Sequence, residues 1–293
     1  MEDGMKIPTS RRSFLSTAAG AGIAAACAPT APAAIQPEPW GIKLGIATYT
    51  FRKFDRAKTI DFIKQLKTPY VSIKQDPHLK LNLQGAELRA AVQEFRAAGL
   101  KVMSAGNTDM KVTTVDGLRP LFEWAKTAEI PMFVAAPVHE ALDAIEKLVK
   151  EYNIKVAIHN HGPEDKNFPS PESVLAAVKG RDPRFGLCMD VGHSERAGSD
   201  PVKAIVEAGP RLLDMHVKDL KFFKDGPEGT AKESQVAVGE GIIPFPQLFK
   251  QLKKMNYQGC VDLEYEIHAD NPMPGVEESF AYMRGVLAGL AAA

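Results

Sequence analysis

The chain has few cysteines. Cys27, Cys188 and Cys260 are the three that occur among its 293 residues, and three thiols cannot build a framework of disulfide bonds. Cys27 lies in an N-terminal leader, and the other two fall within predicted strands. Unpaired cysteine is commonly buried and behaves as a small apolar side chain. We therefore expect Cys188 and Cys260 to be free thiols in the core.

The chain also lacks an excess of charge of either sign. Lys plus Arg and Asp plus Glu number 36 each, whereas nucleic-acid-binding proteins usually carry a basic excess. This balance argues against a nucleic-acid partner. Apolar residues make up 45% of the chain and charged residues 25%, which is usual for a soluble globular protein.

An apolar run long enough to cross a membrane is absent too. The weakly apolar stretch at residues 17–26 is too short, so we expect no integral membrane span. It follows Ser10-Arg11-Arg12-Ser13 and precedes Ala-Pro repeats that end near residue 34. A basic region, a short apolar region and small residues form a secretory signal, and the paired arginines indicate the twin-arginine type. We therefore assign residues 1–34 to a twin-arginine signal peptide that directs residues 35–293 to the periplasm.

Cys27 offers a second kind of attachment, because it follows three alanines and could accept a lipid. Lipoprotein signals usually carry a branched apolar residue three positions before the cysteine, and this chain has Ala24 there. An exported protein without a lipid anchor is therefore favoured over an anchored one.

Predicted strands and helices alternate eight times after the leader. Short apolar runs bounded by Gly and Pro predict strands, and amphipathic segments predict helices. Eight βα units without a break predict a single (β/α)₈ TIM barrel of the α/β class, and a polar loop at residues 219–241 is expected to cover its site. The expected strands are residues 43–50, 70–74, 101–105, 132–135, 154–159, 185–190, 212–216 and 260–265, and the expected helices are 59–66, 86–98, 118–128, 138–152, 171–179, 200–208, 245–255 and 276–290.

Polar side chains stand where four of these strands end. His159 ends the fifth strand, Asp190 the sixth and His216 the seventh, and Glu264 lies near the end of the eighth. The carboxyl ends of barrel strands meet at one face, where active sites form. A lone His there is more often a core or loop residue, and a lone Asp is usually a helix cap. Four such residues at equivalent places predict a metal site with nitrogen and oxygen ligands.

These segments resemble the sugar phosphate isomerase/epimerase family, which has a xylose-isomerase-like barrel. The resemblance covers nearly the whole mature chain. It implies one divalent metal ion held by Glu, Asp, His and Glu, of which Asp190, His216 and Glu264 match three, and by analogy a homo-oligomer. The motifs that carry it are Asp190-Val-Gly-His193, His216-Val-Lys218-Asp219, Gly239-Glu240-Gly241 and Leu263-Glu264-Tyr265-Glu266.

The chain departs from the family pattern at the fifth strand, where His159 stands in place of the usual Glu. A His can still bind the metal ion, and the nitrogen-richer site favours Mn, Zn, Co or Fe over Mg. In the epimerases that resemble this family, the two metal-bound glutamates also move the protons. One acid or base must therefore come from another residue of this chain.

Several residues near the strand ends could supply that group. Lys74, at the end of the second strand, is either an acid or base or a solvated turn residue. His193 corresponds to the family's substrate-contacting His. Glu266 is either a second carboxylate behind the site or exposed. We predict catalytic roles for Glu264, Lys218, Lys74 and His193, and substrate contacts for His161, His193, Lys218, His78 and Glu240.

The chemistry implied by the resemblance is proton abstraction next to a carbonyl group. A divalent ion would act as a Lewis acid on the developing enediolate, while Glu264 or a neighbouring Lys or His takes the proton. Return of the proton gives isomerisation or epimerisation of a sugar or sugar derivative, which we predict. Expulsion of a β-substituent would instead make the chain a lyase or dehydratase of a keto-sugar or keto-glycoside. The missing glutamate and the predicted export both favour this alternative.

Two further classes fit the sequence less well. A periplasmic binding protein for sugars usually closes two domains around its ligand, and this chain has one. The endonucleases that share the barrel need more metal ligands and a basic face, and neither is evident. We therefore expect a small-molecule carbohydrate substrate.

Overall fold

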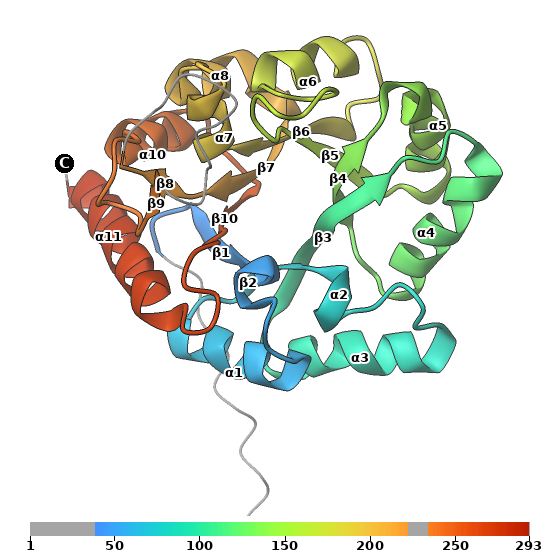
Figure 1. Cartoon of the computed structure of the whole chain (residues 1–293), viewed down its shortest axis with the longest axis horizontal. Helices are drawn as coiled ribbons and strands as arrows, with labels where there is room; N and C mark the ends of the chain where they lie inside the picture. Colours follow the sequence, from blue (N-terminus) through green and yellow to red (C-terminus); the bar gives the residue numbers. More distant parts are fainter. Residues whose placement is uncertain (1–38, 222–233, 293) are drawn as a thin grey trace, which may run out of the picture. The chain divides into compact units, whose positions relative to one another are not determined.

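Eight parallel strands form a closed barrel in the computed structural model, which describes residues 39–221 and 234–292 (Figure 1). Their order around the barrel is β1-β10-β7-β6-β5-β4-β3-β2, and β1 closes it by pairing with both β10 and β2. The predicted TIM barrel is confirmed. Its strands are β1 (Lys43–Ala47), β2 (Tyr70–Ile73), β3 (Lys101–Met110), β4 (Met132–Pro137), β5 (Lys155–His159), β6 (Phe185–Asp190), β7 (Leu212–Val217) and β10 (Cys260–Leu263).

Helices surround the barrel on its outer side (Figure 1). Their starts follow local sequence signals: Asp200 caps α8 by accepting hydrogen bonds from two backbone N–H groups, and Pro171 occupies the first turn of α6. The long helices are α1 (Arg56–Leu66), α3 (Gly85–Ala97), α4 (Val115–Thr127), α5 (Leu142–Tyr152), α6 (Pro171–Val178), α8 (Pro201–Ala208), α10 (Phe245–Lys254) and α11 (Met273–Ala292). Shorter ones are α2 (Gln75–His78), α7 (Val191–Arg196) and the 3₁₀ turns η1 (Thr48–Phe51), η2 (His139–Ala141) and η3 (Gly209–Arg211).

Some boundaries differ from the prediction. The first strand ends at Ala47, and Thr48–Phe51 turns into a 3₁₀ helix. β3 continues to Met110 because its last residues keep pairing with β4, although Gly106-Asn107 is typical of a turn. The predicted loop contains a short antiparallel pair, β8 (Asp219–Leu220) and β9 (Gln235–Val236), while residues 222–233 lie outside the described part.

The barrel interior is polar beneath the carboxyl ends of the strands. Asp214 and Asp262 are both fully buried, and Ser104 donates a hydrogen bond to Oδ2 of Asp214 at 3.2 Å. Gly45 makes room for this arrangement, because a Cβ there would overlap Oδ1 of Asp262. Burial and the charge of Asp262 hold the pKa of Asp214 well above its usual value. Such an interior differs from the branched apolar filling usual in TIM barrels.

Cys188 and Cys260 are buried and unpaired, as predicted. Burial raises the pKa of both thiols well above the usual value, so both are neutral at physiological pH. In the described residues, no helix is long and apolar enough to cross a membrane. The signal peptide and Cys27 fall in residues 1–38, outside the described part, so their assignments stay predictions.

Candidate metal centre and substrate pocket

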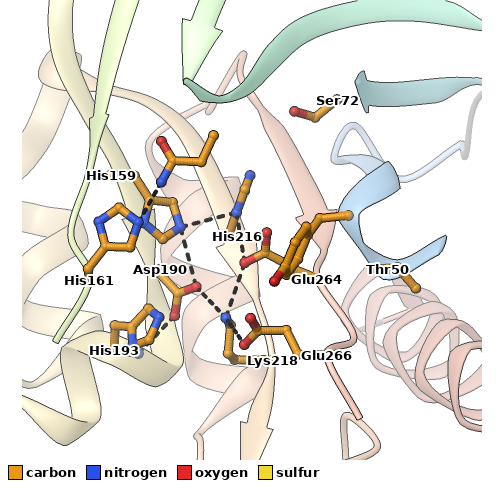
Figure 2. Close-up of polar contacts among 12 residues, drawn as sticks. Thr50, Ser72, His159, His161, Asp190, His193, His216, Lys218, Glu264 and Glu266 are labelled. Carbon is orange, nitrogen blue, oxygen red and sulfur yellow. Dashed lines mark hydrogen bonds and ion pairs between the residues drawn. The ribbon is translucent and has the colours of Figure 1, made fainter. Parts of the chain in front are cut away.

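Four buried side chains from four neighbouring strands converge at the carboxyl end of the barrel (Figure 2). Nε2 of His159 lies 3.1 Å from Nδ1 of His216 and 3.5 Å from Oδ2 of Asp190. Oε2 of Glu264 lies 3.2 Å from the same Nδ1 of His216. One ligand atom from each residue falls within 4.8 Å of the others. The structure therefore brings together the four residues that we predicted as metal ligands.

The backbone around these residues fixes their directions. Asp190 caps α7 by accepting a hydrogen bond on Oδ1 from the N–H of His193 at 2.8 Å, which leaves Oδ2 facing the cluster. Asn160 accepts a hydrogen bond from the N–H of Asp190 at 3.0 Å and donates to its carbonyl at 3.2 Å. Asn160 thus ties the end of β5 to the end of β6. This explains why an amide residue stands between His159 and His161.

The donor set suits a divalent transition metal ion. Two imidazole nitrogens face each other with two carboxylates beside them, a mixed N/O set that matches Zn, Mn, Co or Fe better than Mg. Burial, with the charges of His161 and His216, lowers the pKa of His159 to about 3, so this imidazole is neutral and able to ligate. Burial opposes protonation of His216, but Glu264 and two further carboxylates raise its pKa to about 9. Metal binding would displace that proton.

Lys218 lies inside the cluster rather than in the open pocket. Its Nζ is 3.0 Å from Oδ2 of Asp190, 3.1 Å from Oε2 of Glu264 and 2.7 Å from Oε2 of Glu266. Burial disfavours the charged amine, but the three carboxylates hold its pKa well above the usual value. Lys218 is therefore a fixed cation and not a base, and its partners are carboxylates. Lys218 is not among the residues that line the cavity, and the substrate contact predicted for it stays a prediction.

A cavity of about 290 Å³ opens in front of the cluster. Lys74 reaches it from the end of β2 and donates from Nζ to the carbonyl of Asn107 at 2.8 Å. The cavity brings Lys74, His161 and His193 together with the predicted ligands His159 and Glu264. It is lined by Tyr49, Lys74, Asn107, Asp109, Ala136, His159, His161, His193, Glu264 and Glu266.

Two walls of this cavity differ in chemistry (Figure 2). His159, His161 and His193 stand on one side, with ring centroids of the first two 4.3 Å apart. Glu264 and Glu266 stand on the other side. Burial lowers the pKa of His193 well below its usual value, with the charges of Lys218 and of two other histidines adding to the effect. One wall is therefore made of imidazoles and the other of carboxylates.

The structure does not bring His78 into the site, which corrects our prediction of a substrate contact. His78 is fully buried, and its ring nitrogens are bonded to Thr48 Oγ1 at 2.9 Å and Thr59 Oγ1 at 3.0 Å. Burial lowers the pKa of this imidazole. Hydrogen bonds of His78 thus join η1 to α1.

The substrate contact that we predicted for Glu240 is also wrong. Glu240 is exposed, and it is not among the residues that line the cavity. The motif around it has another purpose. Oδ2 of Asp219 accepts hydrogen bonds from the N–H groups of Gly239 at 2.9 Å and Gly241 at 3.0 Å, and Oδ1 accepts from Ile243 at 3.1 Å. A Cβ on Gly241 would overlap the Asp219 carboxylate. The Gly-Glu-Gly motif therefore wraps a buried carboxylate.

This wrapped carboxylate gives a testable prediction for stability. Asp219→Ala would remove the side-chain acceptor of four backbone N–H groups, those of Leu220, Gly239, Gly241 and Ile243, and we expect a loss of roughly 3 kcal/mol in the free energy of unfolding. Urea denaturation would measure it. Glu240→Ala is the matched control and should change stability by less than about 0.5 kcal/mol. Equal stabilities of the two variants would contradict this account of the motif.

Sequence reasoning missed several residues of the site. Tyr49, Asn107 and Asp109 line the cavity, but they lie in a 3₁₀ turn and in the unexpected extension of β3. Arg196 contacts His193 from one turn further along α7. Gly106-Asn107 after the third predicted strand was an available signal, since polar residues there face the carboxyl end of the barrel.

The chain belongs to the xylose isomerase-like TIM barrel family, whose sequence pattern matches residues 60–286. It is 27% identical over 162 residues to the inosose dehydratase of Mesomycoplasma hyopneumoniae strain 7448, an alignment of 50% of this chain and 53% of that protein. The chain thus spans about half of the length of the curated relatives it matches first.

Solved structures share the fold. The IolI protein, whose crystal structure contains a zinc atom, superposes with a TM-score of 0.68 at 18% identity, over 83% of this chain and 98% of that one. The 3-keto-D-glucoside 4-epimerase YcjR of E. coli superposes with a TM-score of 0.64 at 17% identity, over 83% of this chain and 99% of that one. At these identities the similarity establishes the fold.

Proposed function

We propose that this protein is a metal-dependent lyase of the dehydratase type, which eliminates water or an alcohol from a keto-polyol, keto-sugar or keto-glycoside. The unlike walls of the cavity are the observation that carries the proposal. Epimerisation at one carbon needs two groups that exchange the roles of acid and base on opposite faces. Elimination needs one base and one acid with distinct tasks. A wall of imidazoles opposite a wall of carboxylates suits distinct tasks better.

The residues would divide the work as follows. His159, Asp190, His216 and Glu264 would hold a divalent ion, which supplies Lewis-acid polarisation of the substrate carbonyl when bound. Lys218 balances the charge of Asp190, Glu264 and Glu266 and keeps them in place. A histidine of the imidazole wall would accept the proton from the carbon next to the carbonyl.

Elimination then balances without a further reactant. The electrons of the broken C–H bond form a carbon–carbon double bond, and the bond from the β-carbon to its oxygen breaks. The departing oxygen takes a proton from a donor of the site and leaves as water or an alcohol. The similarity to an inosose dehydratase supports this reading, because that name describes loss of water from a keto-polyol.

An epimerase or isomerase is the second candidate. Glu266 lines the cavity opposite the imidazoles, so a carboxylate could return the proton from the other face. The similar fold of a 3-keto-D-glucoside 4-epimerase supports this reading. Both reactions begin with the same proton abstraction.

Incubation with an inosose and with a 3-keto-glucoside in deuterated water distinguishes the candidates. The protein is first loaded separately with Mn and Zn. We expect an unsaturated ketone, with its ultraviolet absorption and a mass lowered by the lost water or alcohol. A product of unchanged skeleton that carries deuterium would support the epimerase instead. Tight binding without any exchange at any metal loading would indicate a binding protein.

Export through the twin-arginine leader, the boundary at residue 34 and a homo-oligomeric state remain separate proposals.

A further inference from the structure

Tyr49 supplies an aromatic ring to the cavity, and its place follows from the short turn that it occupies. It lies in η1, directly after β1, and it lines the cavity. The other residues of this turn are Thr48, Thr50 and Phe51, and all of them are buried. Tyr49 is therefore the side chain of η1 that can contact a ligand in the cavity.

Hydrogen bonds on both sides of Tyr49 fix the turn. Oγ1 of Thr48 accepts from the N–H of Lys74 at 2.7 Å, and Oγ1 of Thr50 accepts from the N–H of Tyr265 at 2.9 Å. The first bond joins η1 to the end of β2, and the second joins it to the segment that follows β10. A surface held in place before binding loses less conformational entropy when a ligand packs against it.

Two cations lie beside the ring of Tyr49. The guanidinium carbon of Arg52 is 4.7 Å from the ring centroid, and the same group donates to the carbonyl of Glu266 at 2.7 Å. Arg52 is not among the residues that line the cavity, whereas Lys74 does line it, with Nζ 5.9 Å from the centroid. Arg52 thus holds the ring from outside the cavity through a cation–π contact, and Lys74 places N–H donors beside the ring within the cavity.

Closure of the barrel sets Tyr49 opposite the imidazole wall. Three strands separate β1 from β5 in either direction around the barrel, so the end of β1 faces the end of β5. In Figure 2, Thr50 accordingly lies on the other side of the view from His159 and His161. A ligand in the cavity would therefore contact the phenol ring on one side and the imidazoles on the other.

A closed polyol ring matches such a space. It carries C–H bonds on its faces and hydroxyl groups at its edge, and C–H groups next to oxygen are attracted to the electron-rich face of an aromatic ring. An open-chain polyol has no flat apolar face to lay against Tyr49. We propose that Tyr49 is the stacking surface for a cyclic substrate, which makes the site selective for closed rings over open chains.

This assignment rests on the proposed function for its place in the reaction. With one face of the substrate ring against Tyr49, the other face is presented to His161. The hydrogen that is removed next to the carbonyl is then the one on the face directed away from Tyr49. The hydroxyl groups at the edge of the ring are the partners of Lys74.

Binding of two compounds without a carbonyl group tests the proposal, because neither can react. The compounds are myo-inositol, a ring, and sorbitol, an open chain with the same number of hydroxyl groups. NMR titration of protein incubated with Zn should show the ring bound at least about threefold more tightly, with its C–H signals displaced upfield by the aromatic ring. Tyr49→Leu should weaken binding of myo-inositol by about three- to tenfold, abolish the upfield displacement and change sorbitol binding by less than about twofold.

Matched variants separate stacking from the phenol hydroxyl and from folding. Tyr49→Phe keeps the ring and should bind myo-inositol as the wild type does. Tyr152→Leu removes a tyrosine with a similar contact, since the guanidinium carbon of Arg119 is 5.9 Å from its ring centroid, but on a helix outside the barrel. It should leave binding of both compounds unchanged. Wild-type protein that binds ring and chain equally, or binds neither, would overturn the proposal, as would unchanged binding of myo-inositol in Tyr49→Leu.

These results are independent of turnover, so they fail separately from the proposed function. Selective binding of the ring that depends on Tyr49, in a protein that eliminates nothing from an inosose, would contradict the proposed function and leave the stacking assignment standing. Elimination from an inosose with an unchanged KM in Tyr49→Leu would contradict the stacking assignment and leave the proposed function standing.

Discussion

Asp190→Ala is expected to purify without the single equivalent of transition metal that the wild type should carry. Asp190 supplies one of two carboxylates in the cluster, and its Oδ2 faces Nε2 of His159 at 3.5 Å. Loss of a residue that only hydrogen-bonds to a metal ligand costs about 10- to 100-fold in metal affinity. Loss of a ligand itself should therefore cost more than roughly 100-fold. Elimination or epimerisation should fall to background with it. Metal content by mass spectrometry, measured on folded protein, checks the result.

The same side chain also caps α7, so the experiment needs variants that separate the two roles. Asp190→Asn retains an oxygen for the N–H of His193 but loses the charge, and it should fold normally and still bind little metal. Asp200→Ala removes the cap of α8 and should cost about 1 kcal/mol of stability with metal retained. Metal in Asp190→Asn at the wild-type level, or none in the wild type after incubation with Mn or Zn, would refute the metal site.

The ligand residues could be predicted from the sequence because their positions follow from topology. Parallel strands place their carboxyl ends at one face, so His159, Asp190 and His216 had to meet if the barrel closed. The direction of a side chain within that face is less constrained. Lys218 follows His216 by two residues and shares its side of the strand, but the sequence does not say whether an amine turns to substrate or to neighbouring carboxylates.

The failures arise where local structure departs from a repeating pattern. His78 follows β2 as other site residues follow their strands, yet the turn of α2 carries it to Thr48 and Thr59. Asn107 reaches the cavity only because β3 continues past a glycine. Glu240 was chosen for its motif, whereas the flanking glycines serve the Asp219 carboxylate. Each of these positions depends on hydrogen bonds between residues that are distant in the sequence, and a local pattern does not reveal such bonds.

Lys218→Met should lower the stability of the metal-free protein and raise its affinity for metal. The variant keeps an unbranched stem, which packs where Gly192 leaves room for Cγ and Cδ of Lys218, but it leaves Asp190, Glu264 and Glu266 without their shared cation. Removing one partner of a buried ionic group costs roughly 3–5 kcal/mol, so urea denaturation in the presence of a chelator should show a loss of this size.

Metal should reverse that loss, because a divalent cation compensates the same carboxylates. In the wild type the ammonium group lies 3.0 Å and 3.1 Å from oxygens of two candidate ligands and repels an incoming cation. Without it, affinity for Mn or Zn should rise at least about tenfold, and metal should raise the stability of the variant more than that of the wild type. Calorimetric titration measures the affinity.

Lys203→Met, which removes an exposed lysine paired with Glu207 at 3.5 Å, should change neither the stability of the metal-free protein nor its affinity for metal. Unchanged or weaker metal binding in Lys218→Met would mean that Lys218 helps to build the ligand set, and that the cation and the metal ion do not compete for its carboxylates.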